Sequence, residues 1–355
     1  MGNNCIQNSR INQEKDLLRI AFTIKSNKNI IKLNVVCTRE VFCMRISGVT
    51  YAVRKTHTFR KFLLAFLILI LLGVLALVCV SAYYSWLLLH PEKQPLETFS
   101  ANIVPEYRDI SFPSTDKSIT LKGWVFQPKK TDRAVIIVHS YGKNRLEYGI
   151  ETVDLIKEFL NRNYGVLAFD LRNSGESDGK DSTFGYNEKD DVLAAIRYMN
   201  SQGYKNITLL GFSTGASASI LAAAENESVD AVIADSTYAD LEGYLSSSLD
   251  KMTNLPAFPF NRAITFAIKA TGGIEMEKAS PVNALTETAP KNLMLIHGKE
   301  YEPVPVINSI ELINAVFCAV QFLQHAMLPP RSLHLPVPVP DPDCSCMHLQ
   351  AQWPS

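Results

Sequence analysis

The residues best suited to chemistry lie in segment 207–221, where a serine stands between two glycines. The segment runs Ile-Thr-Leu-Leu-Gly211-Phe-Ser213-Thr-Gly215-Ala-Ser-Ala-Ser-Ile-Leu. An apolar, strand-like stretch precedes the Gly-x-Ser-x-Gly motif and small, helix-compatible residues follow it, as in a strand-to-helix turn that exposes a nucleophilic serine. So tight a turn leaves no room for side chains two positions on either side, which explains both glycines. We predict that Ser213 is an acyl-transfer nucleophile; the alternative is an ordinary glycine-flanked turn.

The elements that must position this serine are predicted from the apolar pattern of residues 106 to about 305. Short apolar stretches alternate there with amphipathic ones, which is typical of a mostly parallel sheet covered by helices on both faces. We therefore expect an α/β fold. The predicted strands are 107–112, 119–126, 134–139, 165–170, 207–210, 231–235 and 292–297, and the predicted helices are 151–164, 187 to about 203, and 214–224.

The alternation is interrupted between about residues 241 and 290. Pro256, Pro259 and the pair Gly272-Gly273 surround an apolar run at 263–270. We predict a small cap over the carboxyl edge of the sheet. The alternative is a plain helix pair with no gating role.

Residues 62–84 form a run of 23 residues without a charge. As a helix, this run is long enough to cross a hydrocarbon core of about 30 Å. Four basic residues precede it within 54–61 and aromatic residues follow at 83, 84 and 86, which predicts a cytoplasmic N-terminus and a globular domain on the extracytoplasmic side. The alternative is a cleaved signal peptide with a site near 80–82, although the apolar run is long for one.

The charge is unevenly distributed along the chain. The 35 Lys and Arg equal the 35 Asp and Glu, yet residues 1–61 contain 12 basic against 3 acidic residues, a net charge of +9. The globular part is therefore acidic, and we expect no nucleic-acid partner. Residues 1–61 are predicted to be a basic N-terminal extension and residues 85–105 a linker. Because Met44 would make a more ordinary start, we expect no separate fold in residues 1–43.

The cysteines give a negative expectation. The seven lie at positions 5, 37, 43, 79, 318, 344 and 346, and none falls between 80 and 317. The globular part thus has neither a disulfide framework nor a thiolate metal site. The spacing of Cys344 and Cys346 is too close for a typical zinc pair. We expect no metal and no organic cofactor.

The order of elements and three further motifs resemble the α/β-hydrolase superfamily, in particular its membrane-anchored bacterial branch of serine aminopeptidase-like and esterase/thioesterase-like proteins. His139-Ser-Tyr-Gly142 resembles the family's His-Gly-x-Gly loop, segment 170–177 its Asp-x-Arg-x-x-Gly-x-Ser turn, and His297-Gly298 the end of its seventh strand. The resemblance covers residues 106 to about 305. It implies an α/β-hydrolase fold, hydrolysis of an ester, thioester or amide, and acyl-type small-molecule, lipid or peptide substrates.

The resemblance also implies an oxyanion hole of two backbone N–H groups. One is that of Thr214, directly after the nucleophile. The other is that of Tyr141 in the loop after the third strand, next to Ser140, which replaces the family's usual glycine. We expect His139 to anchor this loop rather than to act as a base.

The predicted acid departs from the family pattern. After its seventh strand the family has His-Gly-x-x-Asp-x-x-Val-Pro, whereas this chain has Tyr301 at the aspartate position, flanked by Glu300 and Glu302. Tyrosine is neutral near pH 7 and cannot stabilise an imidazolium as a carboxylate does. The candidate acids are therefore Glu302, from a shifted loop, and Asp235, at the end of the sixth strand.

The predicted base departs further. The family's histidine follows an eighth strand in a Gly-x-Gly-His-like turn, but this chain has an apolar helix predicted at 304–327 and then seven prolines. The segment 306–355 is predicted to be a divergent helix and Pro-rich tail. His334 is a weak candidate base, with His325 and His348 less suited. Loss of the histidine costs about 10⁶ in turnover, so the alternative to a membrane-anchored serine hydrolase is an impaired pseudohydrolase or binding protein.

Overall fold

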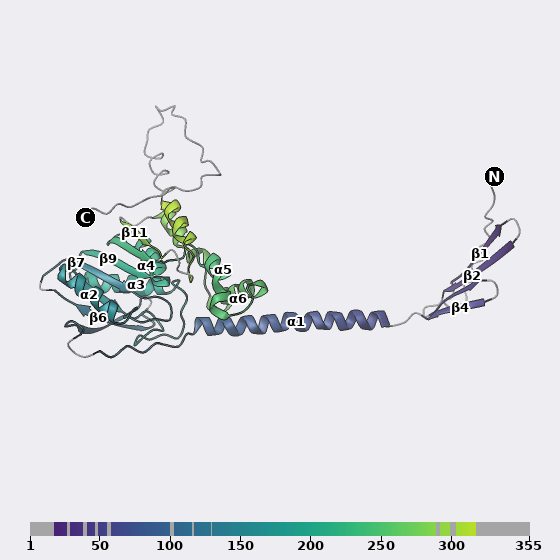
Figure 1. The fold of residues 1–355 in the computed structure, drawn as a ribbon, viewed down its shortest axis with the longest axis horizontal. Coiled ribbons are helices and arrows are strands. Elements are labelled where there is room, and N and C mark those ends of the chain that lie inside the picture. Colours follow the sequence, from purple (N-terminus) through teal and green to yellow (C-terminus); the bar gives the residue numbers. More distant parts are fainter. Residues whose placement is uncertain are drawn as a thin grey trace, which may run out of the picture. The chain divides into compact units, whose positions relative to one another are not determined.

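The computed structural model describes residues 18–26, 29–37, 41–46, 49–54, 58–99, 103–115, 117–128, 130–288, 292–298 and 303–316. The chain divides into two compact units, residues 1–79 and 80–355, and each is described by itself. Figure 1 shows their elements as ribbons.

The first unit contains a four-stranded antiparallel sheet, in contrast to the expectation that residues 1–43 have no fold of their own. Its strands pair in the order β1 (Leu18–Ser26), β2 (Asn29–Cys37), β3 (Val41–Ile46) and β4 (Val49–Arg54). The sequence signal is a period of two in β1, where Leu, Ile, Phe and Ile at even positions alternate mostly with polar residues. The expectation for residues 1–43 rested on Met44 as the start and did not take this alternation into account.

Helix α1 (Thr58–Leu89) contains the predicted span and exceeds it at both ends. Its 32 residues correspond to about 48 Å at 1.5 Å per residue. By length and composition it is able to cross a membrane, with a mean hydropathy of 3.4 in its most apolar window. Residues 85–89, predicted to begin a linker, are the last helical residues.

The second unit is built on a seven-stranded sheet in the order β11-β10-β9-β7-β8-β6-β5. Strands β8, β7, β9, β10 and β11 run parallel, while β6 is antiparallel to both β8 and β5. The predicted strands are all present, with ends shifted by a few residues. Their bounds are β5 (Arg108–Pro113), β6 (Thr120–Phe126), β7 (Arg133–Val138), β8 (Gly165–Phe169), β9 (Asn206–Phe212), β10 (Val229–Asp235) and β11 (Leu293–Ile296).

Helices cover both faces of this sheet, which is why its central strands are apolar without alternation. Val135 and Ile137 of β7 pack with α2 (Ile150–Asn161). The intervening Ile136 packs on the opposite side, with α3 (Glu188–Ser201), α4 (Thr214–Ala224) and α7 (Pro281–Glu287). Each strand therefore supplies side chains to two cores.

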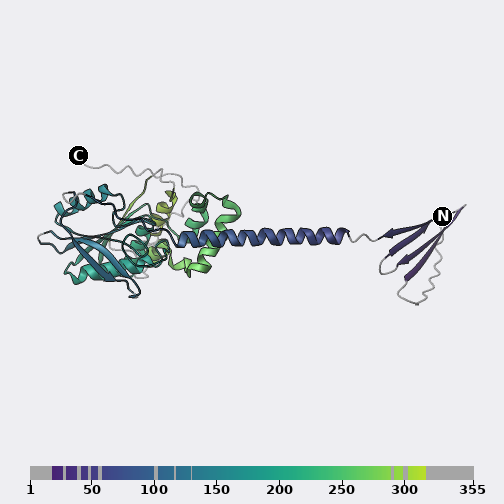
Figure 2. The same ribbon diagram turned by 90° about the horizontal axis from the view of Figure 1, so that it is seen from below.

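The cap region consists mainly of α5 (Leu241–Thr253) and α6 (Ala257–Gly272), which pack on one another, followed by a short 3₁₀ helix at Met276–Lys278. Figure 2 shows the pair from below. The Asp240 carboxylate accepts hydrogen bonds from two N–H groups in the first turn of α5. Because α7 packs on the sheet side with α4, the cap ends nearer residue 280 than the predicted 290.

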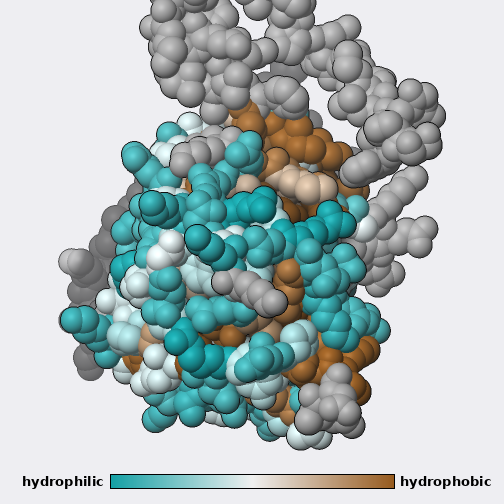
Figure 3. All heavy atoms as spheres, turned by 90° about the vertical axis from the view of Figure 1, so that its left-hand side faces the viewer, coloured by the Kyte–Doolittle hydropathy of each residue, from teal (hydrophilic) through white to brown (hydrophobic). Residues whose placement is uncertain are grey.

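The segment predicted as a linker is fixed along this domain by hydrogen bonds. The Lys93 ammonium donates to the Ser177 carbonyl at 2.6 Å, and the Asn144 amide donates to the carbonyl of Pro95 at 3.1 Å. The part of the domain that lies away from α6 presents a mainly hydrophilic face with smaller hydrophobic patches (Figure 3).

Candidate active site

Ser213 occupies the turn between β9 and α4, as the sequence predicts. Its backbone has φ 49° and ψ −116°, a region that residues other than glycine rarely adopt. The Ser213 N–H donates to the carbonyl of Asp235 at 2.8 Å, and the Ser213 carbonyl accepts from Ala216 and Ser217 in the first turn of α4. These bonds fix a sharp, strained elbow with a partly exposed serine at its tip.

The two glycines of the motif are required by packing. A Cβ atom at Gly211 would lie 2.5 Å from the Cα of Ala216. At Gly215 it would clash with the His139 carbonyl and lie 2.5 Å from the carbonyl oxygen of Val138. All of these obstacles are backbone atoms, which cannot rotate away. Gly215 thus brings α4 directly against the end of β7, where the loop 139–146 begins.

His139 anchors this loop. The imidazole is buried; its Nε2 accepts from the Leu171 N–H at 2.9 Å, and its Nδ1 lies 2.8 Å from the Ser140 carbonyl oxygen. Because a carbonyl can only accept, the proton resides on Nδ1 and the ring is neutral. Both nitrogens are therefore used within the loop, in agreement with the expected anchoring role.

Hydrogen bonds between Ser140 and Glu147 join the two ends of this loop. The Ser140 N–H and hydroxyl donate to the two carboxylate oxygens of Glu147, each at 2.7 Å. Glu147 is buried, so these bonds satisfy a charge that would otherwise be costly. The serine that replaces the family's glycine is thus a specific partner of this carboxylate. The role of Glu147 is not among the sequence predictions. The available signal is a single carboxylate directly after the loop 139–146.

Tyr141 and Thr214, the two predicted oxyanion residues, lie side by side. The Tyr141 N–H donates to the Thr214 hydroxyl at 2.8 Å. The Tyr141 phenol donates to the carbonyl of Leu88 at 2.6 Å, and its ring stacks on Phe184 with centroids 4.7 Å apart. Burial raises the pKa of Tyr141 far above its usual range, so the phenol stays protonated as a donor. Tyr141 therefore connects the last turn of α1 to the loop beside Ser213.

The Thr214 N–H lies in the first turn of α4, where no intrahelical carbonyl is available to accept it. No acceptor is assigned to it among the described residues. Only one of the two predicted donors is therefore open, because the Thr214 hydroxyl occupies the N–H of Tyr141.

We expect Thr214→Val to accelerate acylation about fivefold, because a neutral hydrogen bond of about 1 kcal/mol would no longer compete for the Tyr141 N–H. Valine keeps the shape of threonine and removes its hydroxyl. The measurement is the second-order rate of labelling by a fluorophosphonate, with Thr286→Val on exposed α7 as the control. A slower reaction would show instead that the hydroxyl helps to bind the oxyanion.

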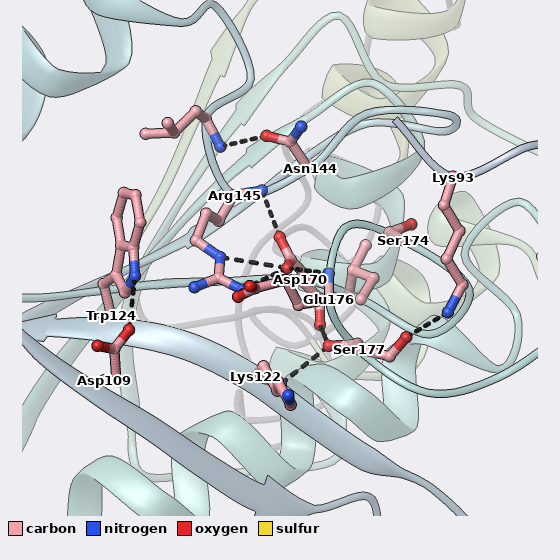
Figure 4. Close-up of polar contacts among 12 residues, drawn as sticks. Lys93, Asp109, Lys122, Trp124, Asn144, Arg145, Asp170, Ser174, Glu176 and Ser177 are labelled. Atoms are coloured by element: carbon pink, nitrogen blue, oxygen red, sulfur yellow. Dashed lines mark hydrogen bonds and ion pairs between the residues drawn. The ribbon is translucent and has the colours of Figure 1, made fainter. Parts of the chain in front are cut away.

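A buried ion pair between Arg145 and Asp170 stabilises the loop 139–146 (Figure 4). The Arg145 guanidinium donates to Oδ2 of Asp170 at 2.6 Å and to Glu176 at 2.8 Å, and the Arg145 N–H donates to Oδ1 of Asp170 at 2.7 Å. Arg145 and Asp170 are almost fully buried, and the guanidinium also lies over the ring of Trp124. The pair ties the oxyanion-type loop to the end of β8.

The other positions of the 170–177 motif have structural partners too. The Arg172 guanidinium pairs with the buried Asp191 of α3 at 2.8 Å. A Cβ atom at Gly175 would clash with the Asp170 carboxylate. The Ser177 hydroxyl donates to the Asp170 carbonyl at 2.6 Å and accepts from the Lys122 N–H at 2.9 Å. The motif thus joins β8 to α3 and β6.

Known proteins are similar to this chain in fold and sequence. The family model described as alpha/beta hydrolase fold matches residues 133–265. The esterase Pf2001 of Pyrococcus furiosus has a TM-score of 0.53 and 25% sequence identity, over 65% of this chain and 85% of that chain. The chain has the α/β-hydrolase fold. The predicted α/β-hydrolase fold, and the hydrolase class at this level, are confirmed.

Two curated relatives of this α/β-hydrolase are bacterial. The uncharacterized protein YqkD of Bacillus subtilis (strain 168) is 26% identical over 262 residues, which cover 69% of this chain and 84% of YqkD. The uncharacterized protein YfhR of Escherichia coli (strain K12) is 26% identical over 211 residues, covering 57% of this chain and 66% of YfhR. The similarity therefore extends over most of the length of YqkD.

Of the candidate acids and bases, Asp235 lies within the described residues. Asp235 is the last residue of β10. Its backbone carbonyl accepts from the Ser213 N–H, and its carboxylate accepts from the Ser236 hydroxyl at 2.8 Å. The other candidates lie outside the described residues: Glu300, Glu302, His325, His334 and His348, as does Tyr301 at the family's aspartate position.

The histidines that the structure does describe have other partners. His297 donates from Nε2 to the Val304 carbonyl at 2.7 Å, with Nδ1 2.7 Å from the Ser309 hydroxyl. His90 pairs with Asp181 at 3.1 Å. His139 forms hydrogen bonds with the Ser140 carbonyl and the Leu171 N–H. In the described part of the α/β-hydrolase, no three His, Cys, Asp or Glu side chains gather into a metal-binding cluster.

Proposed function

We propose that this α/β-hydrolase is a membrane-anchored serine hydrolase that cleaves an ester, thioester or amide through Ser213. The observation that supports this most strongly is the backbone of Ser213, held at φ 49° between two glycines that cannot be replaced without a clash. Strain of about 1–3 kcal/mol at such a position is retained where it serves a function. Here it directs a hydroxyl outward at the carboxyl end of the sheet.

The proposed reaction follows from the neighbours of Ser213. Its oxygen bonds to the acyl carbonyl carbon while its proton passes to a base, and the negative carbonyl oxygen accepts from the N–H of Thr214 and, once it displaces the Thr214 hydroxyl, from that of Tyr141. The carbonyl re-forms as the leaving group departs with the proton, and water then releases the acid from Ser213. Asp235 or Glu302 would orient the base, for which His334 is the candidate.

An ester is the substrate class that the comparisons favour. Pf2001, which is 25% identical over 65% of this chain, is named an esterase. Thioesters and amides pass through the same tetrahedral intermediate, so they remain within the proposal. Small acyl compounds, lipids and peptides all present such a bond.

The anchor is proposed to be α1. Its side chains are largely exposed from Phe59 to Val78, as expected of a helix surrounded by lipid. The basic residues at 54–61 and the aromatic residues after the span favour an N-terminus in the cytoplasm and residues 106–305 on the extracytoplasmic side. Residues 1–61 and 306–355 are proposed to flank the anchor and the catalytic domain.

Labelling with a fluorophosphonate, followed by mass spectrometry, tests the catalytic proposal. We expect the full chain in membranes to acquire one adduct, and fragment ions to locate it on Ser213 rather than on Ser217 or Ser219 of α4. Heat-denatured protein should not react, because reactivity depends on the folded elbow. If native protein stays unlabelled at saturating probe, the nucleophile proposal fails and a pseudohydrolase or binding protein takes its place.

A further inference from the structure

We infer that the exposed face of α6 is a second membrane contact. It binds the phospholipid headgroups of the bilayer that α1 spans. The inference rests on the proposed anchor and goes beyond it, because it assigns a lipid-binding surface to the cap. Its occupant is the bilayer itself.

The first observation is that the end of α1 is packed into the cap. Ser81, Ser85, Leu88 and Leu89 are buried, and their spacing of four, three and one places them on one face of the helix. Leu88 and Leu89 join a cluster that includes Ile264 of α6. The last turns of α1 are therefore a fixed part of the domain rather than a flexible connection.

A hydrogen bond places α6 at the predicted membrane boundary. The Ser85 hydroxyl lies 2.9 Å from the hydroxyl of Thr271, near the end of α6. Ser85 directly follows the uncharged run 62–84, and its neighbours Tyr83 and Trp86 are exposed aromatic residues of the kind found at membrane interfaces. Figures 1 and 2 both draw α6 beside this end of α1. An anchored α1 therefore brings α6 to the headgroup region.

The outward face of α6 has the composition that this region selects. Phe266 is 73% exposed, and the exposed Arg262 lies one helical turn before it; Phe258, at a kink near the start of α6, is 86% exposed. The inward face contains Asn261, Ile264, Thr265 and Ile268. Exposed phenylalanines next to a cation are typical of helices that lie in a membrane interface, where rings enter the acyl boundary and the cation meets phosphate.

The charges around α6 favour the same occupant. Lys269 pairs with Glu277 at 3.5 Å, whereas Arg262 has no carboxylate partner among the described residues. The face of the domain away from α6 is mainly hydrophilic (Figure 3). The element that packs against the end of α1 thus presents a cation and two exposed aromatic rings to solvent.

This contact would also bring the catalytic loop close to lipid. The cluster that joins α1 to α5 and α6 also includes Tyr141, whose phenol bonds to Leu88 and whose N–H is a proposed oxyanion donor. Membrane-resident acyl compounds would reach such a site without crossing bulk water.

Photocrosslinking to lipid tests the surface in the full chain. We would replace Phe266 or Phe258 by p-benzoylphenylalanine and reconstitute each variant into vesicles of phosphatidylcholine and phosphatidylglycerol that contain a fluorescent phosphatidylethanolamine. The matched control is Tyr148, an exposed aromatic residue that packs on Phe212. Phe66 of α1 serves as the control for the anchor. These positions are exposed, so the variants should fold.

We expect lipid adducts at positions 258 and 266 in about tenfold excess over position 148, together with strong labelling at position 66. Labelling at 66 with only background at 258 and 266 would overturn the docking surface and leave the anchor intact. Crosslinks between two copies of the chain at 266 would overturn it in favour of a protein interface. Background labelling at 66 would overturn the anchor and the docking surface with it.

Discussion

Ser213→Ala is expected to reduce ester hydrolysis about 10⁶-fold, to the level left by the oxyanion hole and binding alone. The fold should survive, because the Ser213 side chain is only partly buried and alanine fits wherever serine fits. Hydrolysis of a p-nitrophenyl ester measures the effect. Ser247→Ala on the exposed side of α5 is the matched control, and it should leave the rate unchanged.

Ser213→Gly separates catalysis from strain. Both variants lack the nucleophile, but alanine keeps the unfavourable φ of 49° whereas glycine adopts it freely. We therefore expect the free energy of unfolding of the glycine variant to exceed that of the alanine variant by about 1–3 kcal/mol. Equal stabilities would contradict the strained elbow. Equal activities of wild type and alanine variant would contradict the nucleophile.

The sequence predicted the sheet well because its signals are local. A strand buried on both faces must be apolar throughout, and the apolar runs at 134–138 and 165–169 form such strands. The elbow was equally accessible, since Gly211 and Gly215 mark positions where backbone atoms approach. The sheet in residues 18–54 shows the limit of this reasoning: β1 carries the alternation of a strand, but the position of Met44 favoured an extension without a fold.

The hydrogen bonds that hold the loop 139–146 could not be predicted from the spacing of residues in the sequence. Glu147 binds Ser140 across seven residues, and Tyr141 binds Leu88 across 53. Such partners are chosen by how the chain folds back on itself, which no local period encodes. The end of α1 was misplaced for the same reason. Apolarity sets where a span can lie, whereas the packing of Ser85 against Thr271 sets how far the helix continues into the domain.

Asp170→Asn is expected to lower the free energy of unfolding by about 3–5 kcal/mol, because it leaves a buried guanidinium without its carboxylate. The asparagine amide would turn one donor toward Arg145, which is itself only a donor. Glu176 cannot replace the lost charge, since it is half exposed and its attraction is screened by water. Urea unfolding followed by Trp124 fluorescence reports the change, because the ring lies 5.0 Å from the guanidinium carbon.

Two comparisons make this expectation specific. Asp154→Asn removes a carboxylate from an exposed pair with Lys157, and we expect it to cost about 1 kcal/mol or less. The double variant Arg145→Met/Asp170→Asn should be more stable than Asp170→Asn alone, because it removes the unpaired charge together with its partner. If the effects of the two substitutions on the free energy of unfolding simply added, Arg145 and Asp170 would contribute independently. Their ion pair would then not stabilise the domain. Because Arg145 follows Tyr141 by four residues, the same loss should also slow fluorophosphonate labelling, through a displaced loop rather than an altered nucleophile.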